Sequence, residues 1–541
     1  MELKNKIHYI CLGIIFIIIF ILAWQCDDAY HGHRMSWNLL NGHGFVYNAG
    51  ERVTASTAPL FTLMTTLIFV IIRDVYWASL ILSFICSIAA IYLMQRRLAN
   101  NSEIVLSTII LLFSMSFVSF TTSGVENPML FLWSAIAVII FFNHDEFDSR
   151  TLLLLSFVSS LLITTRMDNA LIVFPLLVYA FFIKSKKKIL AILCGFAGMM
   201  PFISWTLFSF IYYGFPFPNT AYAKLNTGFP FTDYLERGVR YFVMTLLYDP
   251  LVLILPLVYI FFAIYRKNTK HIMLASGFLL YYAYIIYIGG DFMLGRHYTV
   301  CFFLSATCIF DLLKTEKIWK VNKIELKYNV PVIMVLLVCA LLQGPIMSSF
   351  FHPLIPTELV LGNRHIGYPD NGINNTRSYY FASTSIIGRE RRARELGISS
   401  REDATLSFWL LDEYEKAREE SDIGALVFRG SGVIVFEAKD YYMSDNAALG
   451  DPLLARLPAE RLPNWRIGHM TRHFPAGYKE SIQTGENRIV DPSLREYYEV
   501  LRLITRSEDL FAPERIRAII DMNLGRYDYL IEDYISAAKS P

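Results

Sequence analysis

The chain has 541 residues, of which 54% are hydrophobic and only 18% are charged, and its mean hydropathy is +0.40. This composition excludes an ordinary soluble enzyme and indicates a polytopic membrane protein. The formal net charge is only +2, so there is no overall basic excess to suggest nucleic acid as a partner.

The first apolar run covers about residues 7–24 and follows Lys4 and Lys6. A signal peptide has the same layout, but no small-x-small cleavage site follows this run, and Gln25 before Cys26 does not fit a lipoprotein. We therefore expect an uncleaved first membrane span with its lysines in the cytoplasm.

Runs of about 16 to 24 apolar residues recur along the chain, and each is long enough to cross a bilayer core of roughly 30 Å. The expected spans lie near residues 7–24, 76–94, 104–121, 128–143, 151–165, 170–183, 189–211, 242–265, 272–289, 297–313 and 330–349. A further apolar stretch at 57–72 either crosses as well or lies along the membrane surface.

The positive-inside rule decides between these two topologies. If 57–72 does not cross, the basic clusters all share the side of Lys4 and Lys6. These clusters are residues 96–97, 184–188, 265–270 and 314–323. The sequence therefore predicts an α-helical polytopic membrane protein with about 11 transmembrane helices and a cytoplasmic N-terminus.

The same topology places the unusual polar clusters in external loops. These loops lie at 25–56, 121–127, 164–169, 212–241 and 289–297. Internal loops are short and basic, whereas external loops carry Asp, Glu, Arg, His, Asn and Gly. This asymmetry predicts a site at the outer membrane–water boundary.

The sequence predicts a transmembrane domain at residues 1–349. After it, at residues 350–541, we expect a soluble, extracytoplasmic domain of mixed α/β structure, because this part of the chain is rich in Arg, Glu and Asp. All seven cysteines precede residue 350, so this domain is not a disulfide scaffold. Helical spacing marks "DATLSFWLLDEYEKAREE" (403–420), and "GALVFRGSGVIVFEA" (424–438) favours two strands around a Gly-Ser-Gly turn.

Two adjacent carboxylates, Asp27 and Asp28, follow the first span directly. Charged residues often do no more than solvate the end of a span. Here, however, His31, His33 and Arg34 follow at once in a loop rich in glycines and aromatics. Transfer of a sugar from a lipid-anchored phosphate donor would use a carboxylate as general base, because an acceptor hydroxyl must lose its proton.

Cationic residues in the same external loops are candidates for binding the donor phosphate. They are Arg296, His297, Lys224 and Arg34, with Arg166 as a further option. Each has a plainer interpretation. Arg296 could pair with Asp291, Lys224 could extend its ammonium group from a helix at the membrane surface, and Arg166 could pair with Asp168.

The candidates for sugar or acceptor binding are Glu126, Asn219, Asp291 and Tyr30. Asp27 and Asp28 could share a divalent cation, but no histidine or carboxylate spacing typical of a metal site supports one, and we expect no cofactor. No phosphate-binding loop follows a strand, so a cytosolic nucleotide donor is not indicated.

These motifs resemble the C-type (GT-C) glycosyltransferase superfamily, and more narrowly the bacterial group of the mycobacterial terminal β-(1→2)-arabinofuranosyltransferase. The resemblance rests on "DDAY", "WNLLNGHGFVYNAGERV", "TSGVEN", "TRMDNA", "YYGFPFPNTAYAKL", "GGDFMLGR", "LGDPLLARLP" and "RIGHMTRHFPAGY". It implies an inverting transfer at the outer face of the bacterial inner membrane, with Asp27 or Asp28 as the base. We favour Asp27 as the base, with Asp28 helping to position the acceptor or to bind the donor. It also implies a polyprenyl-phosphate arabinofuranose donor and a surface glycan or glycoprotein acceptor.

Two other functions fit a chain with this many spans. A transporter or flippase of a lipid-linked glycan would place charged or broken segments at mid-membrane, whereas the ionisable residues here lie near one surface. An oligosaccharide ligase would share the fold and topology of a glycosyltransferase and would differ only in its product.

The predicted topology can be tested by accessibility labelling. A cysteine introduced at Lys186 is expected to resist a membrane-impermeant reagent added to intact cells, because the 184–188 cluster faces the cytoplasm. Labelling from outside would contradict the orientation.

Overall fold

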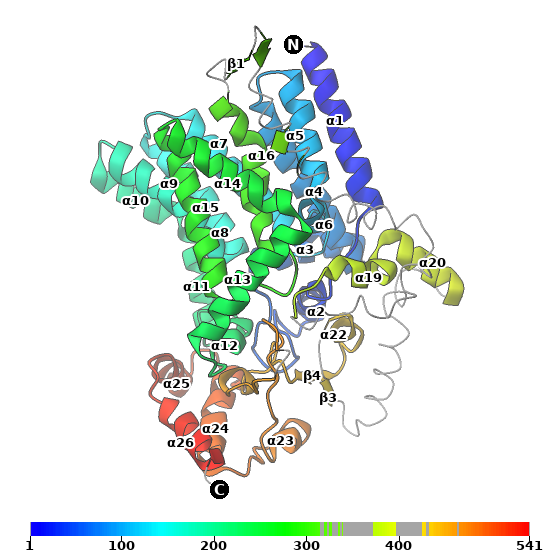
Figure 1. Cartoon of the computed structure of the whole chain (residues 1–541). Coiled ribbons are helices and arrows are strands. Elements are labelled where there is room, and N and C mark those ends of the chain that lie inside the picture. The colour runs from blue at the N-terminus through cyan, green and yellow to red at the C-terminus, as the bar shows by residue number, and fades with distance from the viewer. Residues whose placement is uncertain are drawn as a thin grey trace. The chain divides into compact units, whose positions relative to one another are not determined.

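The computed structural model describes residues 2–313, 319–321, 324–326, 334–335, 338, 372–396, 425–428, 432–462 and 465–539. The predicted boundary at 350 and the predicted helix at 403–420 lie outside these residues, and so does nearly all of the predicted span at 330–349. The chain forms two compact units, which are described one at a time. Figure 1 labels their helices and strands. Unit 1 is formed by residues 1–26, 79–202 and 231–400, and unit 2 by 27–78, 203–230 and 401–541.

Within the residues that the structure describes, the regular elements of unit 1 are helices and one short hairpin. Its helices are α1 (Glu2–Ile21), α4 (Val75–Arg96, which enters this unit at Ser79), α5 (Asn101–Phe113), α6 (Met115–Phe120), α7 (Asn127–Asn143), α8 (Ser149–Thr165), η1 (Met167–Asn169), α9 (Ala170–Val178), η2 (Tyr179–Lys184), α10 (Lys188–Gly198), α13 (Phe231–Tyr248), α14 (Pro250–Tyr265), α15 (Thr269–Tyr287), η3 (Arg296–Tyr298), α16 (Thr299–Leu313), α19 (Thr376–Thr384) and α20 (Ile386–Leu396). The strands β1 (Trp319–Val321) and β2 (Ile324–Leu326) pair antiparallel.

The apolar composition of these helices identifies a multi-pass membrane protein. Three helical stretches, Lys4–Ile21, Val75–Arg96 and Met167–Lys184, are long and apolar enough to cross a bilayer. Two bent pairs raise the number to five if each pair counts as one span. These pairs are α10 with α11 (Met200–Tyr212), bent by 51°, and α13 with α14, bent by 104°. Several other helices are apolar but shorter, and the total of about 11 spans stays a prediction.

Basic residues that are far apart in sequence meet at one end of unit 1. Lys4 Nζ donates to the carbonyl of Leu98 at 2.5 Å. Arg97 pairs with Asp311 at 2.9 Å and lies over the ring of Phe142.

The start of α15 joins this end of the unit. Lys270 Nζ lies 2.7 Å from the carboxylate of Asp145, just beyond the end of α7. The first turns of α1 and α15 and the last turns of α4, α7 and α16 therefore share one end, as the alternating loop charges predict. Which membrane face this end occupies stays a prediction.

Unit 2 combines the first loop region with the C-terminal part of the chain. Its elements are α2 (Ala29–Leu40), α3 (Pro59–Ile72), the part of α11 from Ile203 onward, α12 (Asn219–Leu225), β3 (Ala425–Phe428), α22 (Val433–Glu437), β4 (Tyr442–Asp445), η5 (Leu454–Arg456), α23 (Tyr478–Thr484), α24 (Pro492–Arg506), α25 (Pro513–Asn523) and α26 (Asp528–Lys539). The strands β3 and β4 are parallel, with Ala425 opposite Tyr442 and Phe428 opposite Asp445.

The prediction of two strands at 424–438 is wrong for the second strand, because the segment 433–437 is a helix. The first predicted strand is β3, but "VIVFE" forms the helix α22 and buries Val433, Ile434 and Val435. Gly432 precedes α22 and has φ +108°, a conformation that residues with a side chain rarely adopt. This backbone conformation does not continue a β-strand.

Arg34 of α2 ties the loop region of unit 2 to the C-terminal segment. Its Nε donates to the carbonyl of Tyr47, and Nη1 donates to the carbonyls of Val435 and Ala438. Its Nη2 donates to Asn48 Oδ1 and to the carbonyl of Tyr441. All five guanidinium N–H groups thus have acceptors in the protein, and Arg34 is only 1% exposed. Burial lowers the pKa of Arg34 to about 10, which still leaves it charged at neutral pH.

We expect Arg34→Lys to lower the free energy of unfolding by about 2–5 kcal/mol, because an ammonium group can serve at most three of these five acceptors. Guanidinium titration of the detergent-solubilised protein measures this change. Arg488→Lys at an exposed site is the control and should shift stability by less than about 0.5 kcal/mol. Unchanged stability combined with weakened donor binding would instead support the phosphate role predicted for Arg34.

Candidate functional site

Three loops of unit 1 meet around the carboxylate of Glu126, which immediately precedes α7. Arg166, at the end of α8, places Nη1 2.5 Å from Glu126 Oε1. Arg296, which opens η3, donates from Nη2 to both oxygens of Glu126, at 3.0 and 3.2 Å. One acid therefore holds two arginines from the loops at 164–169 and 289–297, so three of the predicted external loops do converge.

Two further acids extend this charge cluster. Arg166 Nε donates to both carboxylate oxygens of Asp168, at 3.1 and 2.9 Å, which is the local pair that the sequence suggests. Arg296 Nη1 lies 3.7 Å from Asp291 Oδ2, and His297 Nε2 lies 3.3 Å from the same oxygen. The pairing of Arg296 with Asp291 is present as well, but it is longer than the pairing with Glu126.

Neighbouring residues hold the cluster in place. Tyr281 Oη and His297 Nδ1 lie 3.2 Å apart, and Asn127 Nδ2 donates to the carbonyl of Arg296 at 3.1 Å. Gly295 has φ +74°, and a Cβ there would overlap the side chain of Ser116. The backbone can therefore present Arg296 in this way only with glycine before it.

The ionisation of the cluster follows from its burial together with the neighbouring charges. Glu126 is 2% exposed, and burial alone would raise its pKa, but the charges of Arg296 and Arg166 bring the pKa down to about 2. For His297, burial and then the charge of Arg166 lower the pKa, although Asp291 opposes them. At neutral pH, Glu126 is ionised and His297 is neutral.

The arrangement presents oriented guanidinium donors at the end of a set of apolar helices, and its three carboxylates outnumber its two arginines. Its arginines are fixed by carboxylates before any ligand arrives, so little reorganisation is needed when charge develops on a leaving group. Among the residues that the structure describes, no group of three or more His, Cys, Asp or Glu side chains is arranged to hold a metal ion.

The candidate catalytic acids belong to unit 2, so their distance from Arg296 stays a prediction. Asp27 is buried, at 6% exposure, and packs against Gly432. A Cβ on Gly432 would lie 2.8 Å from Asp27 Cβ. Asp28 is half-buried at the start of α2, and the ring of Tyr30 makes an edge contact with His33 at a centroid distance of 5.1 Å.

The other unit 2 candidates have structural contacts. Asn219 Nδ2 donates to the carbonyls of Ala448, Leu449 and Asp451. With its amide so engaged and all five donors of Arg34 in use, the geometry favours a positioning role for both residues over direct ligand binding. Lys224 is half-buried in the last turn of α12.

Two members of the site were not predicted as site residues from the sequence. Tyr281 lies inside an apolar helix where it resembles a core aromatic, and Asn127 follows Glu126 as an ordinary first-turn residue. Only their contacts with His297 and with the carbonyl of Arg296 show their part in the site.

The apolar helices and their converging polar loops fit a polytopic membrane protein. Residues 56–205 match the model of a family described as dolichyl-phosphate-mannose-protein mannosyltransferase. The matched segment contains Glu126, Arg166 and Asp168, but neither Asp27 nor Arg296. No curated protein matches the chain. The family match supports a membrane glycosyltransferase, and it does not identify the sugar or the acceptor.

We expect Glu126→Gln to destabilise the protein by about 3–5 kcal/mol at pH 7, because it leaves buried Arg296 and partly buried Arg166 without their shared charge. The pKa of Glu126 is lower in the folded protein than its ordinary value of 4.5. Its contribution is therefore complete above pH 4.5 and is lost as the pH falls toward 2. Unfolding free energies measured from pH 7 to pH 3 should show the gap between wild type and variant narrowing.

The control for this experiment is Glu236→Gln, which removes an exposed glutamate that pairs with Arg240. It should change stability by less than about 0.5 kcal/mol at every pH. A gap between Glu126→Gln and wild type that does not depend on pH would contradict the electrostatic role of Glu126.

Proposed function

We propose that the protein is an inverting glycosyltransferase that moves a sugar from a polyprenyl-phosphate donor to a cell-surface glycan or glycoprotein. The observation that carries this proposal is the Glu126 cluster, where buried Arg296 and partly buried Arg166 are oriented at the end of apolar helices. A donor whose tail stays in the bilayer would bring its phosphate to such a place. The family match over 56–205 adds support for this reaction class.

In this mechanism, Asp27 accepts the proton of the acceptor hydroxyl as its oxygen bonds to the anomeric carbon. The bond from that carbon to the phosphate oxygen breaks, and polyprenyl phosphate leaves with the electron pair. Inversion follows, because the acceptor attacks from the side opposite the leaving group. Asp28 would help to position the acceptor or the donor, and no metal is required.

Arg296 and His297 are the residues that we expect to contact the donor phosphate. The contact of Arg296 Nη1 with Asp291 is 3.7 Å long, so an incoming phosphate oxygen competes best there. The two hydrogen bonds to Glu126 hold the rest of the guanidinium in place. Lys224 remains a second candidate for the phosphate, and Glu126, Asp291 and Tyr30 remain candidates for the sugar.

The finer assignments follow from the resemblance of the sequence motifs. We propose arabinofuranose as the sugar, with the site and the C-terminal domain on the outer face of a bacterial inner membrane. Mass analysis of the product formed with purified protein and a panel of polyprenyl-phosphate sugars tests the sugar assignment directly. Equal use of every sugar in the panel would remove it.

We expect Asp27→Asn to lower the rate of sugar transfer by about 10²–10⁴-fold with little change in donor binding, because the amide cannot take the proton. Asp28→Asn is the matched neighbour and should have a smaller effect. Transfer from the lipid donor by the purified variants is the measurement. Full activity of Asp27→Asn would exclude it as the base.

A lipid-linked glycan flippase is the second candidate, and one observation favours it. The α13–α14 pair bends by 104°, and its break holds Asp249, which is fully buried and accepts hydrogen bonds from Ser114 and the backbone of Ser116. Broken helices with polar residues are typical of transporters. Movement of the lipid-linked substrate across vesicles without any product would establish this function, whereas transfer of a whole glycan would indicate an oligosaccharide ligase.

A further inference from the structure

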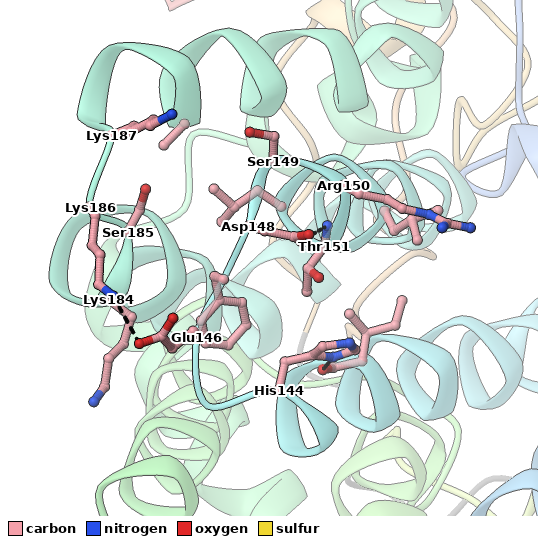
Figure 2. A pocket seen from close by; sticks show the side chains of 15 residues that line it. His144, Glu146, Asp148, Ser149, Arg150, Thr151, Lys184, Ser185, Lys186 and Lys187 are labelled. Atoms are coloured by element: carbon pink, nitrogen blue, oxygen red, sulfur yellow. Dashed lines mark hydrogen bonds and ion pairs between the residues drawn. The ribbon is translucent and has the colours of Figure 1, made fainter.

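A second polar feature of unit 1 lies at the opposite end of α7 and α8 from the Glu126 cluster. It is a pocket of about 700 Å³ formed by the loop at 144–148, the first turn of α8 and the segment 184–187 (Figure 2). Both α7 and α8 have 17 residues, so the pocket lies about 25 Å along the helices from Glu126. That separation is close to the thickness of a bilayer core, which is roughly 30 Å.

The pocket is lined by more cations than acids. Its cations are Lys184, Lys186, Lys187 and Arg150, and its acids are Glu146 and Asp148. Both acids are already engaged: Glu146 pairs with Lys186 at 2.9 Å, and Asp148 accepts a hydrogen bond from the backbone of Thr151 at 2.8 Å. Within the described part of the chain, neither Lys187 nor Arg150 makes an ion pair.

Backbone donors add to this positive character. The helix α10 begins directly after Lys187, whose side chain makes no capping hydrogen bond, so the first N–H groups of α10 have no side-chain cap. Figure 2 shows the ammonium group of Lys187 and the hydroxyl of Ser149 extending toward each other from opposite walls of the pocket. Phosphate oxygens between them would find donors on both sides.

The surroundings of the pocket are apolar and exposed. Phe182, Ile183 and Ile189 are 60%, 59% and 79% exposed, and Leu154, which lines the pocket itself, is 44% exposed. In a membrane protein, such surface faces lipid chains. The segment η2, which leads into the pocket residues 184–187, is a π-helix, and this local departure from the α-helix is frequent at functional sites. An amphiphile with an anionic head and apolar chains matches both parts of this surface.

We propose that this pocket binds the phosphate-bearing headgroup of an anionic phospholipid, in the membrane leaflet at the basic end of unit 1. Lys186, Lys187, the hydroxyl of Ser149 and the first turn of α10 contact the phosphate, and the acyl chains lie along the exposed apolar residues beside it. Glu146 opposes binding, because it occupies Lys186 and repels the phosphate. This site does not depend on the glycosyltransferase reaction proposed above.

Native mass spectrometry of the full-length protein, titrated with phosphatidylglycerol, tests this proposal. Lys187→Gln should weaken phosphatidylglycerol binding about fivefold, and Lys186→Gln with Lys187→Gln about 25-fold. Glu146→Gln should strengthen binding, a gain that a misfolded variant could not produce. Lys267→Gln, which removes an exposed lysine outside the pocket in the loop before α15, is the matched control and should bind as the wild type does.

Two further probes separate the possible sources of the phosphate. Phosphatidylcholine should bind much more weakly than phosphatidylglycerol, and inorganic phosphate at millimolar concentration should not displace the bound phosphatidylglycerol. Equal binding of the two lipids would overturn the proposal, and so would displacement by inorganic phosphate. Loss of binding in Lys267→Gln equal to that in Lys187→Gln would show a general surface attraction and would also overturn it.

Discussion

The sharing of one carboxylate by two arginines is the constraint on which the candidate site depends. Glu126 joins loops that are 40 and 170 residues away in sequence, through contacts of 2.5 to 3.2 Å to Arg166 and Arg296. Removing three charged groups from water costs several kcal/mol for each, so such a cluster adds little net stability. Its effect is geometric. It fixes the loops at the ends of α7, α8 and α15 relative to one another and orients both guanidinium planes before a ligand binds.

The sequence predicted that the loops of this cluster share one end, because the alternation of apolar runs and charged loops encodes which loops lie together. It predicted the pairing of Arg166 with Asp168 because these two residues are close together in the chain. It could not predict that Glu126 is the principal partner of Arg296. That contact spans 170 residues, and no local periodicity reports on a pairing at that range. The comparison of Arg296 with Asp291 shows the limit, because the nearer acid in sequence is the more distant one in space.

Unit 2 shows why residue type alone is a weak guide to ligand binding. Arg34 and Asn219 carry the planar donors that suit phosphates and sugars, and the sequence therefore marks them as candidates. Main-chain carbonyls accept the same hydrogen bonds, and in the structure Arg34 binds carbonyls about 400 residues further along the chain. The segment 433–437 failed as a predicted strand for a related reason. Its β-branched residues favour a strand locally, but Gly432 turns the chain, and burial of three apolar side chains then selects a short helix.

The two polar ends of the α7–α8 pair differ in the physics of their charges. At the Glu126 end the charges are buried and paired, so salt screens them little and their orientation is set in advance. At the Lys187 end the cations are exposed and outnumber the acids, so their field reaches into solvent and falls off within about 8–10 Å at physiological salt. A buried, oriented cluster suits a step in which charge develops at a fixed atom, and an exposed basic pocket suits reversible binding of a mobile lipid headgroup. Between these two ends α7 and α8 carry no ionisable residue, so each end can serve its own ligand independently.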